Sequence, residues 1–469
     1  MAEIIVVIPG IMGTSLFLPA DGNGEPEKVW PPTWDESLNI TGYKRIEKLV
    51  SPKLQVGDVI QHVCGVDFYR PLTQLLKRCG FRSEPTVPKF FVEFPYDWRR
   101  DLRATKEHLE NFLDSKTDGY DRITILAHSM GGLIARLALE DPKNSKRPWL
   151  GKVVRTIFLG TPHNGAPLAI ARAIGIDEDL GISGGDFRKL ANHPDFPSGI
   201  QLFPSPGAGS CWNQHSPELA AIDVFDTKVA SQLELNPDSL EACKDVHRML
   251  QAGAAPQHVQ YLSVASSSHR TGTRVNFYEN ASGEFYPRGA SLTKSKGGGD
   301  GTAPIFSTLL SSGQQLIVVE KHATIFASRG FKAYFERVND VLSGPMLHDF
   351  NDVSKEGEVF FDFSFESMTL PTNQALEVTI DFYGSLGSGE ENAKIVYTIT
   401  RCAEDTLALS DVKYRIDNAL EGPIISPFKI QLPSIDEPGI YQLDVSIGKS
   451  PIKSKRIAIS KPSLNGSAN

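Results

Sequence analysis

Short apolar runs alternate with stretches of helical periodicity over roughly the first two thirds of the chain. Each run is brief and almost continuously apolar, as in strands that are buried on both faces. The predicted strands are 3–8, 89–94, 122–127, 152–159, 258–265 and 314–320, and the predicted helices are 68–79, 101–113, 133–140 and 324–341. This alternation predicts an α/β fold with a doubly wound parallel sheet.

Two long stretches, 16–66 and 165–257, do not follow this alternation. Insertions of this length in a compact domain usually form lids or binding loops. We therefore expect a lid at about 16–66 and a cap at about 165–257. The first stretch contains Trp30 and Trp34, which either contact an interface or an acyl chain, or pack against the core.

After about residue 345 the pattern changes to alternation with a period of two residues. It is clearest at 359–365, 376–382, 394–400 and 441–447, and glycines at 384–389 indicate a turn. The pattern predicts a small antiparallel β-sandwich at 346–460, separate from a catalytic domain at 1–345. Residues 461–469, rich in Ser, Asn and Gly, are predicted to be a disordered tail.

The apolar run that begins at residue 122 ends at Ser129, between small residues. Ala127 and Gly131 stand two positions before and after the serine, and a helical pattern follows. A strand, a sharp turn and a helix around A-x-S-x-G are typical of a nucleophile elbow, although the usual signature has glycine in place of Ala127. The sequence therefore predicts Ser129 to be a nucleophile.

A serine nucleophile requires a histidine base and an acid, expected in the order Ser, Asp/Glu, His. Asp300 follows the glycines 297–299, and His322 follows the last apolar run. His269 and His348 are the alternative bases. His128 adjoins the nucleophile and is interpreted as a pocket or packing residue, because neighbouring side chains on a tight turn point apart.

Two backbone N–H groups are expected to form an oxyanion hole. Met130 follows the nucleophile and supplies the first. The turn after the first strand supplies the second from Ile11, with Met12 as the alternative. Lys294 and Lys296, next to the glycines at 297–299, are predicted to lie on a mobile loop and not in a basic patch.

Composition limits the partners of the chain. The net charge is -8 without a cluster of Lys and Arg, so no nucleic acid is expected. No apolar stretch reaches the length of a membrane span, and no signal peptide is recognisable, which predicts a soluble, cytoplasmic protein. The five cysteines have no metal-ligand spacing and are predicted to be free thiols, with Cys64–Cys79 and Cys211–Cys243 bridges as alternatives. No cofactor or metal is expected.

Four segments in order carry a resemblance to a known family. They are Val7 to Gly13, Pro95 to Arg99, Ala127 to Gly132 and Gly299 to Pro304, followed by His322. Residues 1 to about 342 resemble the lecithin:cholesterol acyltransferase family, which includes lysosomal phospholipase A2 and phospholipid:diacylglycerol acyltransferases. The resemblance implies an α/β-hydrolase fold, a triad of Ser129, Asp300 and His322, and an oxyanion hole formed by the backbone of Ile11 and Met130.

The resemblance also implies that Tyr96 to Arg99 lie near the site, where Asp97 and Arg99 could instead form a structural ion pair. Residues 160–165, Gly-Thr-Pro-His-Asn-Gly, depart from the family: they resemble a segment of many serine lipases more than the tryptophan-containing version of the animal members.

The sequence thus predicts a serine hydrolase that cleaves or transfers acyl groups of lipid esters through an acyl-enzyme. Its expected partners are a lipid ester substrate and, transiently, a membrane or lipid surface. Whether water or an alcohol accepts the acyl group stays open. The alternative hypothesis is an interaction protein that has the fold but no catalytic activity.

Overall fold

The computed structural model describes residues 2–20, 24–37, 42–63, 66–85, 88–216, 218 and 220–343, and beyond these 360–365, 369–372, 374–383, 394–402, 409–419, 428–447 and 453–460. The chain divides into two compact units. The first comprises Met1–Thr33 and Tyr43–Met346, and the second Trp34–Gly42 and Leu347–Asn469.

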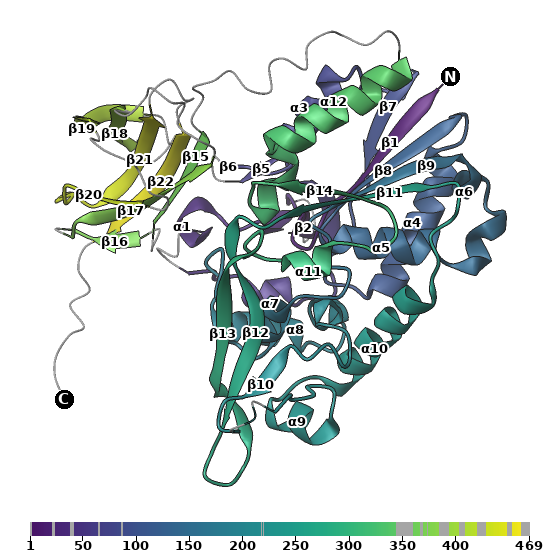
Figure 1. Cartoon of the computed structure of the whole chain (residues 1–469), viewed down its shortest axis with the longest axis horizontal. Helices are drawn as coiled ribbons and strands as arrows, with labels where there is room; N and C mark the ends of the chain where they lie inside the picture. Colours follow the sequence, from purple (N-terminus) through teal and green to yellow (C-terminus); the bar gives the residue numbers. More distant parts are fainter. Residues whose placement is uncertain are drawn as a thin grey trace. The chain divides into compact units, whose positions relative to one another are not determined.

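A parallel sheet forms the centre of the first unit (Figure 1). Its strands lie in the order β14-β11-β9-β8-β1-β7, and every neighbouring pair is parallel. The strands are β1 (Glu3–Ile8), β7 (Lys89–Glu93), β8 (Arg122–His128), β9 (Val153–Leu159), β11 (Gln260–Ser266) and β14 (Gln314–Val318). The six predicted strands are these six, which confirms the α/β class.

Helices cover both faces of the sheet (Figure 1). Ile4, Val6 and Ile8 point from β1 into a core shared with α4 (Leu102–Lys116) and α5 (Met130–Leu139). Ile5 and Val7 point to the other face, into a core shared with α3 (Arg70–Arg78) and α12 (Arg329–Ser343). Side chains of a strand alternate between faces, so a strand that is apolar throughout is buried on both.

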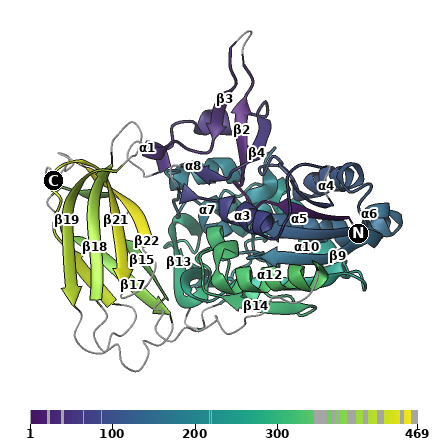
Figure 2. The ribbon, with the colours of Figure 1, turned by 90° about the horizontal axis from the view of Figure 1, so that it is seen from above.

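The two long insertions form separate substructures. The first contains a small antiparallel sheet that Figure 2 shows beside the central one, β2 (Thr14–Leu18), β3 (Glu27–Trp30) and β4 (Gln55–Val59). It also contains α2 (Ile46–Leu49), β5 (His62–Val63) and β6 (Val66–Asp67), whereas α1 (Trp34–Ser37) clusters with the second unit. The second insertion contains α7 (Pro167–Ala173), α8 (Gly184–Ala191), η2 (Pro197–Leu202), β10 (Cys211–Asn213), α9 (Thr227–Gln232) and α10 (Pro237–Ala252).

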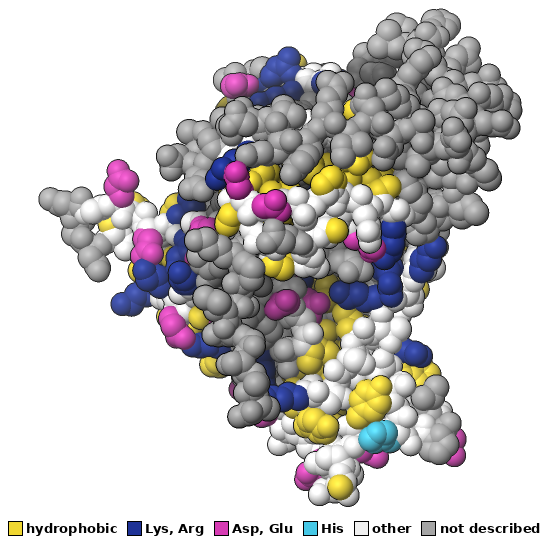
Figure 3. All heavy atoms as spheres, turned by 90° about the vertical axis from the view of Figure 1, so that its left-hand side faces the viewer, with side chains coloured by type: hydrophobic (Ala, Val, Ile, Leu, Met, Phe, Trp, Pro, Cys, Tyr) yellow, Lys and Arg dark blue, Asp and Glu magenta, His cyan; other side chains and the backbone are white. Residues whose placement is uncertain are grey.

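A long hairpin was not predicted from the sequence. It consists of β12 (His269–Glu279) and β13 (Phe285–Gly299), and β12 also pairs with β10. Few of its residues are apolar, because only one face packs against the second insertion, through side chains such as Val275 and Phe277. The other face is polar, and hydrophobic side chains appear there only in separate patches (Figure 3).

The prediction of a mobile loop at Lys294 and Lys296 was wrong. Both lysines lie on β13, and Lys294 pairs with Gly272 of β12 in the ladder. Main-chain hydrogen bonds with the neighbouring strand hold this segment, and no apolar alternation is needed to form them.

The remaining elements of the unit are η1 (Pro142–Lys146), α6 (Pro148–Lys152), α11 (Ile305–Thr308) and η3 (His322–Ala327).

The second unit contains two sheets with mainly antiparallel pairing. One has the order β15-β17-β20 and the other β16-β22-β21-β18-β19. The strands are β15 (Phe360–Phe365), β16 (Thr369–Pro371), β17 (Leu376–Tyr383), β18 (Lys394–Cys402), β19 (Leu409–Ala419), β20 (Phe428–Leu432), β21 (Gly439–Ile447) and β22 (Lys453–Ser460). The predicted turn at 384–389 and tail at 461–469 lie outside the described residues.

Two sequence expectations can be compared directly with the described residues. Cys211 and Cys243 carry free, buried thiols, so the predicted alternative of a bridge between them is wrong. Cys64 lies outside the described residues. No helix in the described part of the chain is long and apolar enough to cross a bilayer.

Candidate active site

Ser129 occupies a strained turn between β8 and α5. Its backbone has φ +53° and ψ −126°, and a residue with a Cβ adopts a positive φ only at a cost in free energy. Close packing holds the turn: a Cβ on Gly131 would lie 2.4 Å from the carbonyl oxygen of Pro9. These features are typical of a nucleophile elbow.

His322 lies between Ser129 and Asp300. Its Nε2 is 2.8 Å from Ser129 Oγ, and its Nδ1 is 2.7 Å from Asp300 Oδ2. The backbone N–H of His322 also donates to the carbonyl oxygen of Asp300, at 2.9 Å. The structure therefore brings together the three side chains that chain order had selected.

Asp300 is held in its ionised form although it is almost completely buried, with 1% of its surface exposed. Burial alone would raise its pKa, but the interaction with His322 and the amides of Thr302 and Ala303 outweigh burial, so the pKa is lowered. An ionised Asp300 accepts the Nδ1 proton of His322. Nε2 is then free to accept the proton of the Ser129 hydroxyl.

Ile11 and Met130, the two donors expected for an oxyanion hole, lie near Ser129. Met130 is the first residue of α5, and Ile11 lines the same pocket as Ser129. Neither N–H has a hydrogen-bond acceptor among the described residues. Met12, the alternative donor, has φ +64°, and its carbonyl oxygen accepts from Trp30 Nε1.

A buried chain of hydrogen bonds behind the site was not predicted from the sequence. The N–H of Gly10 donates to Tyr69 Oη at 2.8 Å, Tyr69 Oη is 2.7 Å from His128 Nδ1, and His128 Nε2 is 2.9 Å from the carbonyl oxygen of His322. Since a carbonyl oxygen only accepts, His128 must carry its proton on Nε2, and the Tyr69 hydroxyl donates to Nδ1. Burial, and then the nearby His322, lower the pKa of His128 to about 3, which keeps this histidine neutral.

This chain of hydrogen bonds joins three loops of the site. Gly10 precedes Ile11, His128 precedes Ser129, and the last acceptor belongs to His322 itself. His128 is thus a buried packing residue, as predicted, and it also bonds the loop that carries His322. Tyr69 gave no signal in the sequence, because only the tertiary structure brings α3 to this place.

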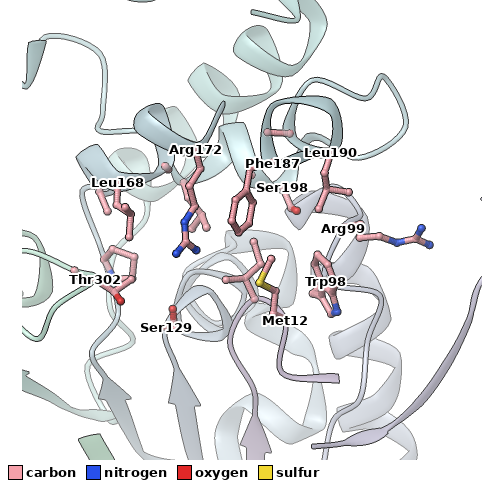
Figure 4. Close-up of a pocket in the computed structure, with 18 of the residues that line it drawn as sticks. Met12, Trp98, Arg99, Ser129, Leu168, Arg172, Phe187, Leu190, Ser198 and Thr302 are labelled. Atoms are coloured by element: carbon pink, nitrogen blue, oxygen red, sulfur yellow. The ribbon is translucent and has the colours of Figure 1, made fainter. Parts of the chain in front are cut away.

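An apolar pocket opens at Ser129 (Figure 4). Side chains of the second insertion form its upper wall in this view, and Met12 and Trp98 lie opposite. The apolar side chains that line it include Met12, Trp98, Leu168, Phe187, Leu190, Phe196 and Leu202. Such a pocket fits an acyl chain better than a polar substrate.

Two arginines also line this pocket, and both are paired. Arg99 bonds Asp97 at 2.7 Å and stacks on the Phe196 ring at 4.1 Å. The resemblance offered proximity to the site or an ion pair for Asp97 and Arg99, and the structure shows both. Arg172 pairs with Asp177 and Asp179, at 3.1 and 2.6 Å.

The other sequence candidates lie elsewhere. His269 Nδ1 is 2.7 Å from the Ser268 hydroxyl, and it is not part of the Ser129–His322–Asp300 arrangement. His348 lies outside the described residues. Trp30 is buried and packs on Trp98, with ring centroids 5.5 Å apart, so the core alternative holds for this residue. The side chain of Trp34 is not described.

Comparison with known proteins gives a family match for part of the chain. The family model described as lecithin:cholesterol acyltransferase matches residues 40–263, just under half of the chain. Residues 40–263 match the lecithin:cholesterol acyltransferase family. This match confirms the resemblance that the four sequence motifs predicted.

Individual relatives are more distant. An uncharacterized protein of Saccharomyces cerevisiae, YJR098C, is 28% identical over 222 residues, which cover 45% of this chain and 31% of the yeast protein. The chain therefore spans about a third of that relative. A chain of the Tle4–Tli4 complex has a TM-score of 0.51 at 13% identity, with 72% of this chain and 98% of that chain covered. At this identity the likeness supports the fold alone.

The family match is to proteins whose description names an acyltransferase that acts on a lipid. It agrees with the apolar character of the pocket at Ser129.

Proposed function

We propose that the protein is a serine hydrolase that cleaves or transfers acyl groups of lipid carboxylic esters through an acyl-enzyme. Ser129 attacks the ester carbonyl, His322 accepts the hydroxyl proton and returns it to the leaving alcohol, and Asp300 orients the imidazole. The N–H groups of Ile11 and Met130 stabilise the oxyanion. Water or a second alcohol then takes the acyl group from Ser129.

The observation that carries this proposal is the hydrogen-bonded series Ser129–His322–Asp300 on a strained turn, at the end of an apolar pocket. The alternative is an interaction protein without catalytic activity. Such a protein would have no need to hold a serine at positive φ within 2.8 Å of a histidine. Strain of this kind persists where function maintains it.

Tyr69 and His128 belong to the proposal as positioning residues. Neither touches the reacting atoms. Their hydrogen bonds hold the backbone beside Ile11 and the carbonyl group of His322, and thus fix the distance between oxyanion hole and base.

The division of the chain is also part of the proposal. Residues 1–345 form an α/β-hydrolase domain, with the cap at about 165–257, and residues 346–460 form a β-sandwich. The cap is supported by the pocket wall, to which it contributes Leu168, Phe187 and Leu190. The sandwich is supported by one apolar core that includes Val378 of β17 and Leu443 of β21, from different sheets. The proposed lid at about 16–66 has less support, since none of its described residues lines the pocket.

An active-site-directed fluorophosphonate tests the nucleophile. It should label the parent protein at Ser129, and Ser129→Ala should lose labelling and about 10⁴- to 10⁶-fold in kcat on a water-soluble ester. His322→Ala should be similarly inactive, whereas His269→Ala should keep most activity. Labelling that persists in Ser129→Ala would refute the assignment.

The acyl acceptor requires a separate measurement. Mixed lipid vesicles with and without a long-chain alcohol should yield free fatty acid alone if water is the acceptor. They should also yield a new ester of the long-chain alcohol if the alcohol is the acceptor. An intact, folded protein that releases neither product and is not labelled would favour the interaction protein.

A further inference from the structure

A second recess is lined in part by His163 and Asn164, from the loop formed by residues 160–165. It has a volume of about 280 Å³ and is lined by Arg136, His163, Asn164, His247, Leu250, Gln251 and 309–311. Arg136, His163 and His247 are buried and form its floor, whereas Asn164, Gln251 and Ser311 are exposed and form its rim. The mechanism proposed above uses none of these residues.

His163 is the unusual residue of this floor. Only 2% of its surface is exposed, yet neither ring nitrogen has a hydrogen-bond partner among the described residues. Buried polar side chains almost always have partners, and an orphaned group requires an explanation. Burial, and then the charge of Arg136, hold the pKa of His163 well below its usual range, so the ring is neutral and offers one donor and one acceptor.

Among the described residues, the neighbouring side chains leave one hydrogen-bond donor and one hydrogen-bond acceptor unpaired. Arg136 uses Nε and Nη2 for Glu140 and the carbonyl oxygen of Leu250, and its Nη1 has no acceptor in the described part of the chain. His247 Nε2 lies 2.8 Å from the carbonyl oxygen of Phe203, so this nitrogen donates. Burial lowers the pKa of His247, and Nδ1 is therefore an acceptor that the described residues leave unpaired.

A ligand that pairs with all of these groups needs several hydrogen-bond acceptors and at least one hydrogen-bond donor. Inorganic phosphate has both at neutral pH, because HPO4²⁻ keeps one P–OH proton, whereas a phosphate monoester, with a second pKa of about 6, keeps this proton only in its monoanion. Sulfate and phosphate diesters have hydrogen-bond acceptors but no P–OH or S–OH donor at neutral pH. The recess is large enough for one such group with several waters, at roughly 30 Å³ for each water, and Arg136 supplies a cation suited to phosphate.

We propose that this recess is a binding site for one phosphate group that still carries a proton, either inorganic phosphate or a phosphate monoester. The phosphate oxygens accept from Arg136 Nη1, His163 and the rim side chains. The P–OH group donates to His247 Nδ1. The site is separate from the ester chemistry, and it stands or falls independently of the function proposed for Ser129.

Calorimetry on the full-length protein tests the site with inorganic phosphate, glycerol 3-phosphate, glycerophosphocholine and sulfate. Inorganic phosphate should bind at least about tenfold more tightly than sulfate, since an acceptor without a donor is costly when buried. At about pH 6, where half of it keeps the P–OH proton, glycerol 3-phosphate should bind like phosphate if the natural source is a monoester. The diester glycerophosphocholine should bind as weakly as sulfate, which separates these ligands from a phospholipid headgroup.

Variants identify the recess as the place of binding. His163→Phe should abolish phosphate binding, and His215→Phe, which replaces an exposed histidine elsewhere, should have no effect. His247→Gln keeps a donor for Phe203, but its amide oxygen does not occupy the position of Nδ1, so it should reduce the preference for phosphate over sulfate. Should His163→Phe fail to fold by circular dichroism, Gln251→Leu on the exposed rim should still weaken binding several-fold.

Three results would overturn the proposal. These are no phosphate binding by the parent protein, sulfate binding as tight as phosphate binding, or unchanged binding in both His163→Phe and Gln251→Leu.

Discussion

Replacing Tyr69 by Phe removes a single oxygen atom from the centre of the site. That oxygen accepts from the N–H of Gly10 and donates to His128 Nδ1. The ring itself would stay in place, stacked on Phe326 with centroids 5.4 Å apart. The substitution therefore leaves one buried donor and one buried acceptor without a partner, and it changes little else.

The size of the effect follows from these two groups. Each buried polar group that loses its partner costs about 1–3 kcal/mol, so the loss of two partners should lower the free energy of unfolding by about 2–6 kcal/mol. His128 also loses the bond that fixes its proton on Nε2, which weakens its hold on the His322 carbonyl group. We expect kcat to fall about 10- to 100-fold from misplacement of the base and the oxyanion hole. KM should change little, because Tyr69 does not line the pocket.

Steady-state kinetics on a water-soluble ester and thermal unfolding measure the two effects separately. Tyr43→Phe is the matched control, since Tyr43 is also buried and its hydroxyl donates to a backbone carbonyl, that of Val29, away from the site. It should lower stability without lowering kcat. If Tyr69→Phe behaves like Tyr43→Phe, with lower stability and an unchanged kcat, the positioning role is refuted.

Three further predictions concern the site and its support. Asp300→Asn should keep the fold but lose about 10⁴-fold in kcat, because an amide no longer fixes the tautomer of the base; near-normal kinetics would exclude its role. Gly131→Ala should abolish activity and lower Tm, since the added Cβ would lie 2.4 Å from a carbonyl oxygen, whereas Gly151→Ala, with open space around it, should be neutral in both assays. His128 has a lowered pKa in the folded protein, so its contribution to stability is complete above its unfolded pKa of about 6.5 and is lost as pH falls below that value. Unfolding free energies should thus drop by roughly 1–2 kcal/mol for this residue between about pH 7.5 and 5.5, and a drop equally large in His128→Gln would contradict the assignment.

The residue pattern was sufficient to predict the central sheet and the order of the candidate triad. β1 is apolar at every residue after Glu3, and such a run occurs in soluble proteins mainly where both faces of the sheet are covered. The elbow was predictable because the strained turn at Ser129 depends on small neighbours such as Gly131, which are visible in the sequence.

Local patterns were insufficient where stability comes from elsewhere in the chain. The β12–β13 hairpin is mostly polar and is held by a ladder of backbone hydrogen bonds. Its sequence therefore shows no apolar alternation, and the lysines on β13 were misassigned to a loop. The sequence predicted free thiols but left a bridge between Cys211 and Cys243 open, because bridging depends on distances that only folding sets.

By itself, the sequence determined the α/β class, the family resemblance and the chain order of Ser129, Asp300 and His322, since each of these depends on residues close together in the chain or on its apolar periodicity. Only the tertiary structure decided that Tyr69 and His128 connect the loops of the site, and that His163 faces a recess and has no hydrogen-bond partner among the described residues. Those contacts join segments far apart in the chain. Their strength depends on burial, which no single segment of the sequence specifies.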